Sequence, residues 1–258
     1  MRLQDRVALV TGGGRGIGRA IALAFAREGA HVALVARTAV ELEAVAAETR
    51  ALGRKAVALP CDVTDSAQVE AAVRTAAEAL GSIQVLVNNA GIAVSAKLTD
   101  TDDALWARHL QVNLTGAFYM SRAVLPGMLA ARRGRIINIA STAARQGSPY
   151  LAAYVASKHG LLGLTRALAM EVVASGITVN AICPGYVATA LTRESARRIQ
   201  EKTGRSYEEA VQALAAFSPQ RRLVEPEEVA ALAVVLASDE ARGVTAQAWN
   251  VDGGAVQS

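Results

Sequence analysis

Short apolar runs alternate with helical patterns along this chain, and this alternation restricts the fold more than any other feature of the sequence. Runs rich in Val, Ile, Leu and Ala, each bounded by turn residues, occupy 7–10, 32–35, 56–59, 85–87, 136–139, 177–182 and 248–251. Helical patterns separate them, at 17–29, 42–52, 67–80, about 103–131, about 154–174 and 227–237. Strands that are apolar on both faces and alternate with helices are typical of a parallel sheet covered on both sides.

The number and order of these units indicate a doubly wound α/β fold. About seven strands with intervening helices predict a Rossmann-type parallel sheet with helices on both faces. The length of 258 residues suits a substantial core, and no linker, low-complexity tract or break in composition interrupts the pattern. We therefore expect a single domain over residues 1–258.

The distribution of charge argues against nucleic-acid binding. The formal net charge is +4, and the basic residues are scattered among acidic ones. The densest basic cluster, at 132–135, is explained by a helix C-terminus, where cations complement the helix dipole. We therefore expect neither a DNA nor an RNA partner.

The cysteines, histidines and apolar segments exclude other classes of protein. Cys61 and Cys183 form no CxxC motif, which fits the reducing cytoplasm better than a disulfide framework. The three histidines, His31, His109 and His159, lack metal-ligand spacing, so no metal is expected. No apolar segment approaches the ~20 residues that cross a bilayer, and the short charged N-terminus does not read as a signal peptide. We expect a soluble cytoplasmic protein with no membrane partner.

A glycine-rich turn joins the first expected strand to the first expected helix. Gly12, Gly16 and Gly18 have the spacing G-x-x-x-G-x-G. Between a strand and a helix, such a turn lets the backbone approach a pyrophosphate at the positive helix N-terminus. The alternative is a tight turn without a ligand. The position of the glycine turn between a strand and a helix favours nucleotide binding over this alternative.

The end of the second strand indicates which nicotinamide dinucleotide would bind. An acidic residue there would bond the ribose 2′-hydroxyl of NAD, whereas an arginine accommodates a 2′-phosphate. The sequence at 35–38 has Arg37 and no carboxylate, and Arg15 in the glycine turn could add a second cation. Either arginine alone could be a solvated surface residue. Together they favour NADP(H), and NAD(H) is the alternative.

Tyr154 and Lys158 are the strongest candidates for catalysis. Four residues apart, they share one face of a helix. Free tyrosine has a pKa near 10, and a neighbouring ammonium stabilises the phenolate and lowers that pKa. Ser141 ends the apolar run before this helix, so all three side chains could surround one carbonyl oxygen. The alternative is a chance pair on a solvated helix.

The order of these motifs resembles the single-domain type of the short-chain dehydrogenase/reductase family across almost the whole chain. The matching positions are Thr11, Gly12, Gly16, Gly18, Asp62, the 88–91 Asn-Asn-Ala-Gly turn, Asn113, Ser141, Tyr154, Lys158, Pro184, Gly185, Thr189 and the 250–254 segment.

The resemblance implies a role for each of these residues. Tyr154 would donate the proton in carbonyl reduction, and Lys158 would lower its pKa and hold the nicotinamide ribose. Ser141 would bond the carbonyl oxygen, Asn113 would hold a relay water, and Thr189 would touch the carboxamide. The residues expected to contact the cofactor are Gly12, Arg15, Gly16, Ile17, Gly18, Arg37, Asp62, Val63, Asn89, Ala90, Gly91, Tyr154, Lys158, Pro184, Gly185, Val187 and Thr189.

The segment 186–217 is the part that such enzymes use as a variable substrate lid. Its apolar residues Tyr207, Val211, Leu214 and Phe217 have helical spacing, which fits either a lid over an apolar pocket or ordinary core packing. The residues expected to line a substrate site are Val94, Ala143, Leu151, Tyr186, Leu191 and Phe217.

Two subfamilies look similar, the aromatic-polyketide ketoreductases and the 3-hydroxybutyrate dehydrogenases. The latter hold a carboxylate with polar and basic side chains, where this chain has Ala143 and Leu151. A buried carboxylate without a partner is costly, although Arg145 or Arg193 could supply one. We therefore expect an NADPH-dependent carbonyl reductase of the 3-ketoacyl type, acting on a bulky ketone or acyl thioester.

Two other functions are left open by the residues. One is an NAD-dependent secondary-alcohol or 3-hydroxy-acid dehydrogenase, and the more remote one is a non-catalytic nucleotide-sensing protein. The long apolar helices, and the usual assembly of single-domain members of the family, lead us to expect a homotetramer.

Overall fold

A single parallel sheet runs through the computed structural model, which describes residues 1–257, and the strand order is β3-β2-β1-β4-β5-β6-β7. Every neighbouring pair is parallel, so that Leu9 lies between Ala33 and Leu86 in the central register. The strands are β1 Val7–Thr11, β2 His31–Ala36, β3 Ala56–Pro60, β4 Val85–Asn88, β5 Gly134–Ile139, β6 Ile177–Pro184 and β7 Ala248–Val251. The predicted Rossmann-type sheet is confirmed.

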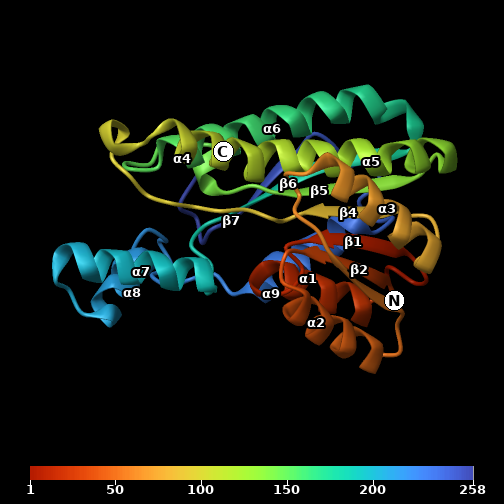
Figure 1. The fold of residues 1–258 in the computed structure, drawn as a ribbon, viewed down its shortest axis with the longest axis horizontal. Helices are drawn as coiled ribbons and strands as arrows, with labels where there is room; N and C mark the ends of the chain where they lie inside the picture. The colour runs from red at the N-terminus through yellow and green to blue at the C-terminus, as the bar shows by residue number, and fades with distance from the viewer. Residues whose placement is uncertain (258) are drawn as a thin grey trace.

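Helices cover both faces of the sheet (Figure 1). One face carries α1 Gly16–Arg27, α2 Ala39–Ala51 and α9 Pro226–Ala237. The other carries α3 Ser66–Leu80, α4 Asp103–Leu110, α5 Gly116–Ala131 and α6 Ala152–Val172. Between α4 and α5 the single long helix expected from the sequence is interrupted by a π-helical turn at Gln111–Thr115.

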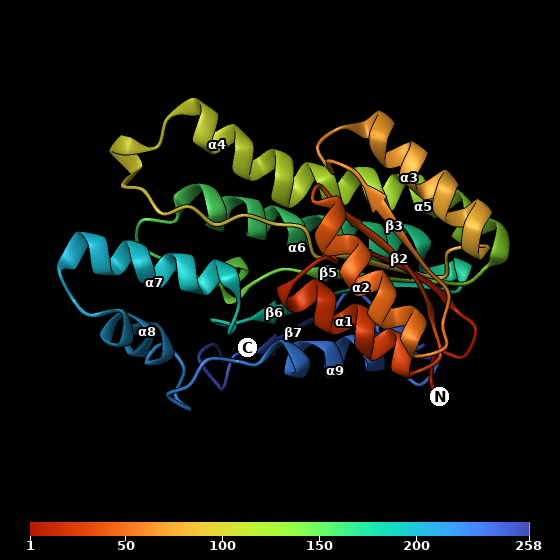
Figure 2. The ribbon, with the colours of Figure 1, turned by 60° about the horizontal axis from the view of Figure 1, so that its bottom comes forward.

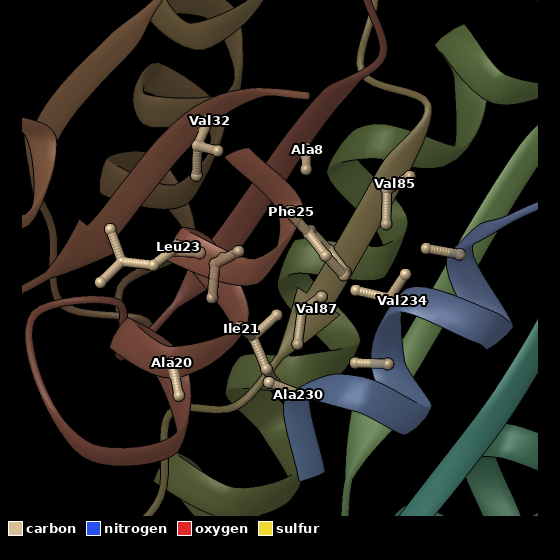
Figure 3. Close-up of a cluster of buried hydrophobic side chains, with 14 of the residues drawn as sticks. Ala8, Ala20, Ile21, Leu23, Phe25, Val32, Val85, Val87, Ala230 and Val234 are labelled. Atoms are coloured by element: carbon tan, nitrogen blue, oxygen red, sulfur yellow. The ribbon is translucent and has the colours of Figure 1, made fainter. Parts of the chain in front are cut away.

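Each face of the sheet has its own apolar core, because the strand residues alternate between the two sides. On the α1 side, Phe25 and Ile21 point toward Val85 and Val87 of β4 and toward the helix that carries Val234 (Figure 3). Phe25 and Ile21 are completely buried. These contacts fix α1, and with it the glycine-rich turn at its N-terminus, against the central strands.

A buried hydrogen-bond network crosses the other core. The Asn88 amide nitrogen donates to the Asn138 side-chain oxygen at 2.9 Å and to the Ser121 hydroxyl at 3.1 Å. The Asn138 amide donates to the Thr165 hydroxyl at 2.8 Å. The network joins β4, β5, α5 and α6, so it holds the two strands that lead to the candidate site against the helix that carries Tyr154.

The predicted lid segment contains two helices, α7 Ala190–Thr203 and α8 Tyr207–Ala215, which lie together at one end of the molecule (Figure 2). The helical pattern around Tyr207 predicted α8, but the strongly polar α7 was not predicted. The apolar side of α8 packs against α7 around Ala196, Ala210 and Leu214. Of the two interpretations of this pattern, the packing fits ordinary core packing. Phe217 lies beyond the end of α8.

Within residues 1–257, no helix combines the length and the apolar character needed to cross a membrane.

We predict that Asn138→Ala lowers the free energy of unfolding by about 2–3 kcal/mol, because it leaves buried polar partners without hydrogen bonds. Chemical denaturation followed by circular dichroism measures this loss. Gln200→Ala on the exposed surface of α7 is the control, and its expected change is within about 0.5 kcal/mol. Equal stabilities of the two variants would contradict the assigned importance of the network.

Candidate active site

The strand order reverses between β1 and β4, and in doubly wound sheets ligands bind outside the carboxyl ends of the strands at such a point. The glycine-rich turn follows β1 there. Gly12 and Gly16 have φ of +63° and +55°, in the left-handed region that favours glycine. A Cβ atom on Gly18 would lie 2.2 Å from the Gly12 carbonyl oxygen, so only glycine permits this approach of helix and strand.

The N-terminus of α1 fits a pyrophosphate. Arg15 occupies the N-cap position without a side-chain hydrogen bond to the helix, and the first turn contains no acidic residue. The first N–H groups of an α-helix have no partner within the helix, and they lie at the positive end of its dipole. The turn therefore offers backbone donors and positive potential to an anion.

The end of β4 anchors the glycine turn. The Asn89 amide nitrogen donates to the carbonyl oxygens of Thr11 and Gly12, at 2.9 and 3.2 Å. The backbone N–H groups of Asn89 and Ala90 donate to the Thr11 hydroxyl, at 2.9 and 3.0 Å. Thr11 was not among the predicted cofactor residues, although it directly precedes Gly12. The side chains of Thr11 and Asn89 thus set the shape of the turn.

The two predicted 2′-phosphate ligands differ in their surroundings. Arg37 is exposed and follows the end of β2 directly. Arg15 is also exposed, and its guanidinium lies 3.4 Å from the Glu41 carboxylate. Asp62, after β3, accepts hydrogen bonds on Oδ1 from the backbone and hydroxyl of Thr64. Arg15 thus lies in the turn after β1 and Arg37 at the end of β2, where the adenosine half of a dinucleotide would be expected.

Val63 and Ile17 belong to the packing around this site. Val63 is buried in the core beneath α3 and α5, and a Cβ on Gly116 would lie 2.8 Å from its Cγ2. Ile17 packs against the core on the α1 side. These predicted cofactor residues support the walls of the site through their side chains.

The structure brings Ser141, Tyr154 and Lys158 together at the end of β5. Ser141 lies two residues beyond the end of β5, and its hydroxyl interacts with the Tyr154 phenol. The Lys158 ammonium, in the second turn of α6, donates to the Ile139 carbonyl at 2.8 Å. The ammonium lies 5.8 Å from the centre of the Tyr154 ring. The predicted arrangement of strand end and helix face is therefore present.

The pKa of Tyr154 shifts in the direction opposite to the one expected from the sequence. Burial raises the pKa of the phenol, and the hydrogen bond with Ser141 offsets only part of that effect. Burial also lowers the pKa of Lys158 to about 8. Removal from water disfavours the charged form of each group, so the ammonium does not acidify the phenol here. A phenol protonated at neutral pH is the form that can give a proton to a carbonyl oxygen.

Asn113 lies in the π-helical turn and uses its side chain to hold the chain that follows β4. Its Oδ1 accepts from the Ile92 N–H at 2.8 Å, and its Nδ2 donates to the Ile92 carbonyl at 3.0 Å. Nδ2 also donates to the Ser157 hydroxyl at 3.0 Å, which in turn donates to the Tyr154 carbonyl. Both amide hydrogens are therefore engaged by protein, and the water relay through Asn113 stays a prediction.

Gly91 lies between Asn113 and Lys158. A Cβ on Gly91 would lie 3.3 Å from the Asn113 Oδ1 and 3.6 Å from the Lys158 Nζ. The absence of a side chain at this position leaves room beside the ammonium. The predicted approach of the 89–91 backbone to the cofactor stays a prediction.

The segment after β6 returns to the glycine turn. Gly185, directly after Pro184, packs so closely on Asp252 that a Cβ would lie 3.2 Å from the Asp252 Cβ. Val187 forms an isolated parallel bridge with Val224. Thr189 precedes α7 and lies against the glycine turn, since a Cβ on Gly16 would lie 3.2 Å from its Cγ2. The segment that precedes α7 therefore lies against the glycine turn that precedes α1.

The residues expected to line the substrate site differ in exposure. Ala143 is buried, and Val94, Leu151 and Tyr186 are partly buried. Leu191 and Phe217 are exposed, at 44% and 65%, although the Phe217 ring lies 5.5 Å from the ring of Tyr186.

Three further expectations concern the charge of Arg145, the cysteines and metals. The Arg145 guanidinium donates to the Ala248 carbonyl of β7, so it is already engaged by protein. Cys61 and Cys183 are free and buried. Within residues 1–257, no group of three or more His, Cys, Asp or Glu side chains is placed to hold a metal ion.

Comparison with known proteins identifies the family. The model of the family described as short chain dehydrogenase matches residues 6–200. The chain belongs to this family. It is therefore an oxidoreductase that interconverts ketones and secondary alcohols with a nicotinamide cofactor.

The relatives include reductases and dehydrogenases. A Streptomyces violaceoruber protein named "Granaticin polyketide synthase putative ketoacyl reductase 1" is 44% identical over 254 residues, covering 96% of this chain and 92% of that protein. D-beta-hydroxybutyrate dehydrogenase of Cupriavidus necator is 39% identical over 255 residues, covering 98% of both chains. A crystal structure of an actinorhodin polyketide ketoreductase variant with NADPH has a TM-score of 0.94 and 41% identity, covering 97% of both chains.

We predict that kcat/KM for the reduced cofactor falls above about pH 8, because the Lys158 ammonium, with its pKa lowered to about 8, is lost there. The sign follows from the charge, since the cation exists below the pKa and the neutral amine above it. Burial raises the pKa of Tyr154, so the phenol is not the group that titrates near pH 8. Initial rates between pH 6 and 10 measure this fall, the alkaline limb of the pH profile of kcat/KM.

Lys158→Arg is the control, because a guanidinium stays charged throughout this range. The variant should show no loss of kcat/KM near pH 8, whatever its absolute activity. A limb that persists unchanged in this variant would assign the titration to another group.

Proposed function

We propose that this protein is an NADPH-dependent carbonyl reductase that converts 3-ketoacyl-type ketones to secondary alcohols. The observation that carries the cofactor preference is the exposed Arg37 at the end of β2, where a carboxylate would be needed to bond the 2′-hydroxyl of NAD. Arg15 supplies a second guanidinium from the glycine turn. A relative of 41% identity that crystallised with NADPH supports the same preference.

In this mechanism the protein positions the reactants and supplies the proton. When bound, NADPH would supply the hydride for the carbonyl carbon. The uncapped N-terminus of α1 would hold the pyrophosphate, and Lys158 would hold the nicotinamide ribose. The Ser141 hydroxyl bonds the carbonyl oxygen, and the Tyr154 phenol donates its proton to that oxygen as negative charge develops there. In the reverse direction the phenolate accepts the proton of the alcohol.

The surroundings of Ser141 and Tyr154 favour an apolar substrate. Ala143 and Leu151 flank these residues and offer no charge to a substrate carboxylate, and Arg145 is bonded to the Ala248 carbonyl. A carboxylate buried without a partner is costly. We therefore favour a ketone in a bulky or acyl-thioester compound over a free short keto acid.

The second candidate is an NAD-dependent secondary-alcohol or 3-hydroxy-acid dehydrogenase. The 39% identity to D-beta-hydroxybutyrate dehydrogenase supports it. Arg193 is exposed on α7, and it could still meet a carboxylate. The measured preference between the two dinucleotides and between charged and neutral ketones distinguishes the candidates.

We also propose that one domain spans residues 1–258, that 186–217 covers the bound substrate, and that the protein assembles as a homotetramer. The α7–α8 pair lies at the end of the molecule where the strands β5 and β6 lead (Figure 2). Exposed apolar side chains on α5, α6 and β7 support assembly, among them Phe118, Met170 and Trp249.

We predict that Arg37→Asp weakens NADPH binding about 10- to 100-fold and leaves NADH binding little changed, because a charged hydrogen-bond partner of the 2′-phosphate is lost. Fluorescence titration with each reduced dinucleotide measures both affinities. Arg27→Asp, in the last turn of α1, is a charge-matched control. Equal losses for NADH and NADPH would refute the 2′-phosphate assignment.

We predict that Tyr154→Phe lowers kcat for ketone reduction at least about 100-fold, because no other proton donor occupies its position. Binding of NADPH, followed by fluorescence, should change less than about twofold if the phenol acts on the substrate oxygen. Unchanged turnover would eliminate the assigned proton donor.

A further inference from the structure

His109 is a completely buried histidine that the mechanism above does not use. It lies in the last turn of α4, with Nδ1 2.9 Å from the Leu105 carbonyl oxygen and Nε2 3.1 Å from the backbone nitrogen of Val94. A backbone N–H can only donate, so Nε2 must accept. The carbonyl can only accept, so Nδ1 carries the proton. These two partners therefore fix a neutral ring in one tautomer.

The partner of His109 belongs to a segment that runs outward from the candidate site. Residues 92–96 follow Gly91 and have no helix or strand of their own. Hydrogen bonds from surrounding elements hold this backbone at Ile92 (to Asn113), Ala93 (from Arg198), Val94 (to His109) and Ala96 (to the Tyr150 carbonyl). The segment thus passes between the π-helical turn, α7 and the approach to α6.

His109 and Asn113 act on this segment as a pair. Spaced four residues apart, they project from adjacent turns of the same helical face. Asn113 holds both polar backbone groups of Ile92, and His109 holds the N–H of Val94. The two side chains provide what a neighbouring β-strand would provide, a row of partners for an extended backbone.

The same histidine also touches the candidate proton donor. Its ring lies edge-on to the Tyr154 ring, with centroids 6.4 Å apart and planes at 74°. Edge-to-face contacts of this kind favour one relative orientation of the two rings. One buried side chain therefore connects the 92–96 backbone with the phenol.

We propose that His109 is a positioning residue that sets the spacing between the 92–96 segment and the Tyr154 phenol, and thereby the place of the substrate carbonyl. The expected effect of His109 on catalysis rests on the proposed function, whereas the contacts of His109 do not depend on any substrate. A purely apolar residue would fill the same space but leave the Val94 N–H without an acceptor. Imidazole combines the acceptor, the donor and the flat ring.

Two variants separate these contributions. His109→Phe keeps a ring beside Tyr154 and removes the acceptor for Val94. His109→Gln removes the ring, and its side-chain oxygen can take the place of Nε2 as acceptor. His159→Gln on α6 is the matched control, since His159 is exposed and bonds only the Val155 carbonyl of its own helix.

We expect His109→Phe to raise KM for the ketone about tenfold, because a buried N–H is left unpaired and the segment shifts. Affinity for NADPH should stay within about twofold. His109→Gln should recover most of the KM increase, and His159→Gln should behave as wild type. Steady-state kinetics with a bulky ketone and NADPH, together with fluorescence titration of NADPH, give these values.

Hydrogen–deuterium exchange tests the positioning without any substrate. In His109→Phe the peptide that contains 92–96 should exchange at least about tenfold faster than in wild type, with protection restored by His109→Gln. Unchanged exchange and KM in His109→Phe would overturn the proposal, as would a Gln variant that is no better than Phe. If no ketone is reduced by the wild type, the proposed function fails, whereas the exchange result still decides the positioning role.

Discussion

The chemistry of this protein depends on the reversal of strand order between β1 and β4, because the reversal opens space beyond the carboxyl ends of the strands. The turn after β1 and the turn after β4 lie side by side there. Thr11 and Asn89 bond one turn to the other, so the glycine backbone has a fixed shape before any nucleotide arrives. Preorganisation of this kind reduces the cost of ordering the site when the ligand binds.

Burial governs the electrostatics of the candidate catalytic groups. Lys158 is 4% exposed, and its ammonium donates a hydrogen bond to the Ile139 carbonyl. Burial lowers its pKa to about 8. Tyr154 is shifted the other way for the same reason, since its charged form is the anion. In the protein without nucleotide, both groups are therefore biased toward their neutral forms. The phenol can act as an acid, which suits reduction more directly than oxidation.

The sequence predicted what depends on local pattern. Apolar runs located the seven strands that residues 1–257 form, and the glycine spacing and the Tyr154–Lys158 spacing placed the corresponding residues near the ends of strands. The polar helix α7 was missed because only Thr192 and Ala196 are buried along it, which leaves almost no apolar stripe. The π-helical turn at Asn113 was missed because the residues around it read as one continuous helix.

The local spacing of residues in the sequence could not predict features that depend on tertiary contacts. The direction of the Tyr154 pKa shift depends on how deeply the finished fold buries the phenol, and i, i+4 spacing does not carry that information. His109 has no motif, and its contact with Val94 joins α4 to a loop that has no regular structure. Thr11 did carry a signal, its place directly before Gly12, but its hydroxyl acts through partners far away in the sequence.

A crystal structure with bound NADP⁺ would test the central claim most directly. The account predicts that the pyrophosphate lies at the N-terminus of α1, with the Tyr154 oxygen beside C4 of the nicotinamide and the Lys158 nitrogen bonded to its ribose. A dinucleotide bound elsewhere, with Tyr154 and Lys158 remote from the nicotinamide, would contradict it.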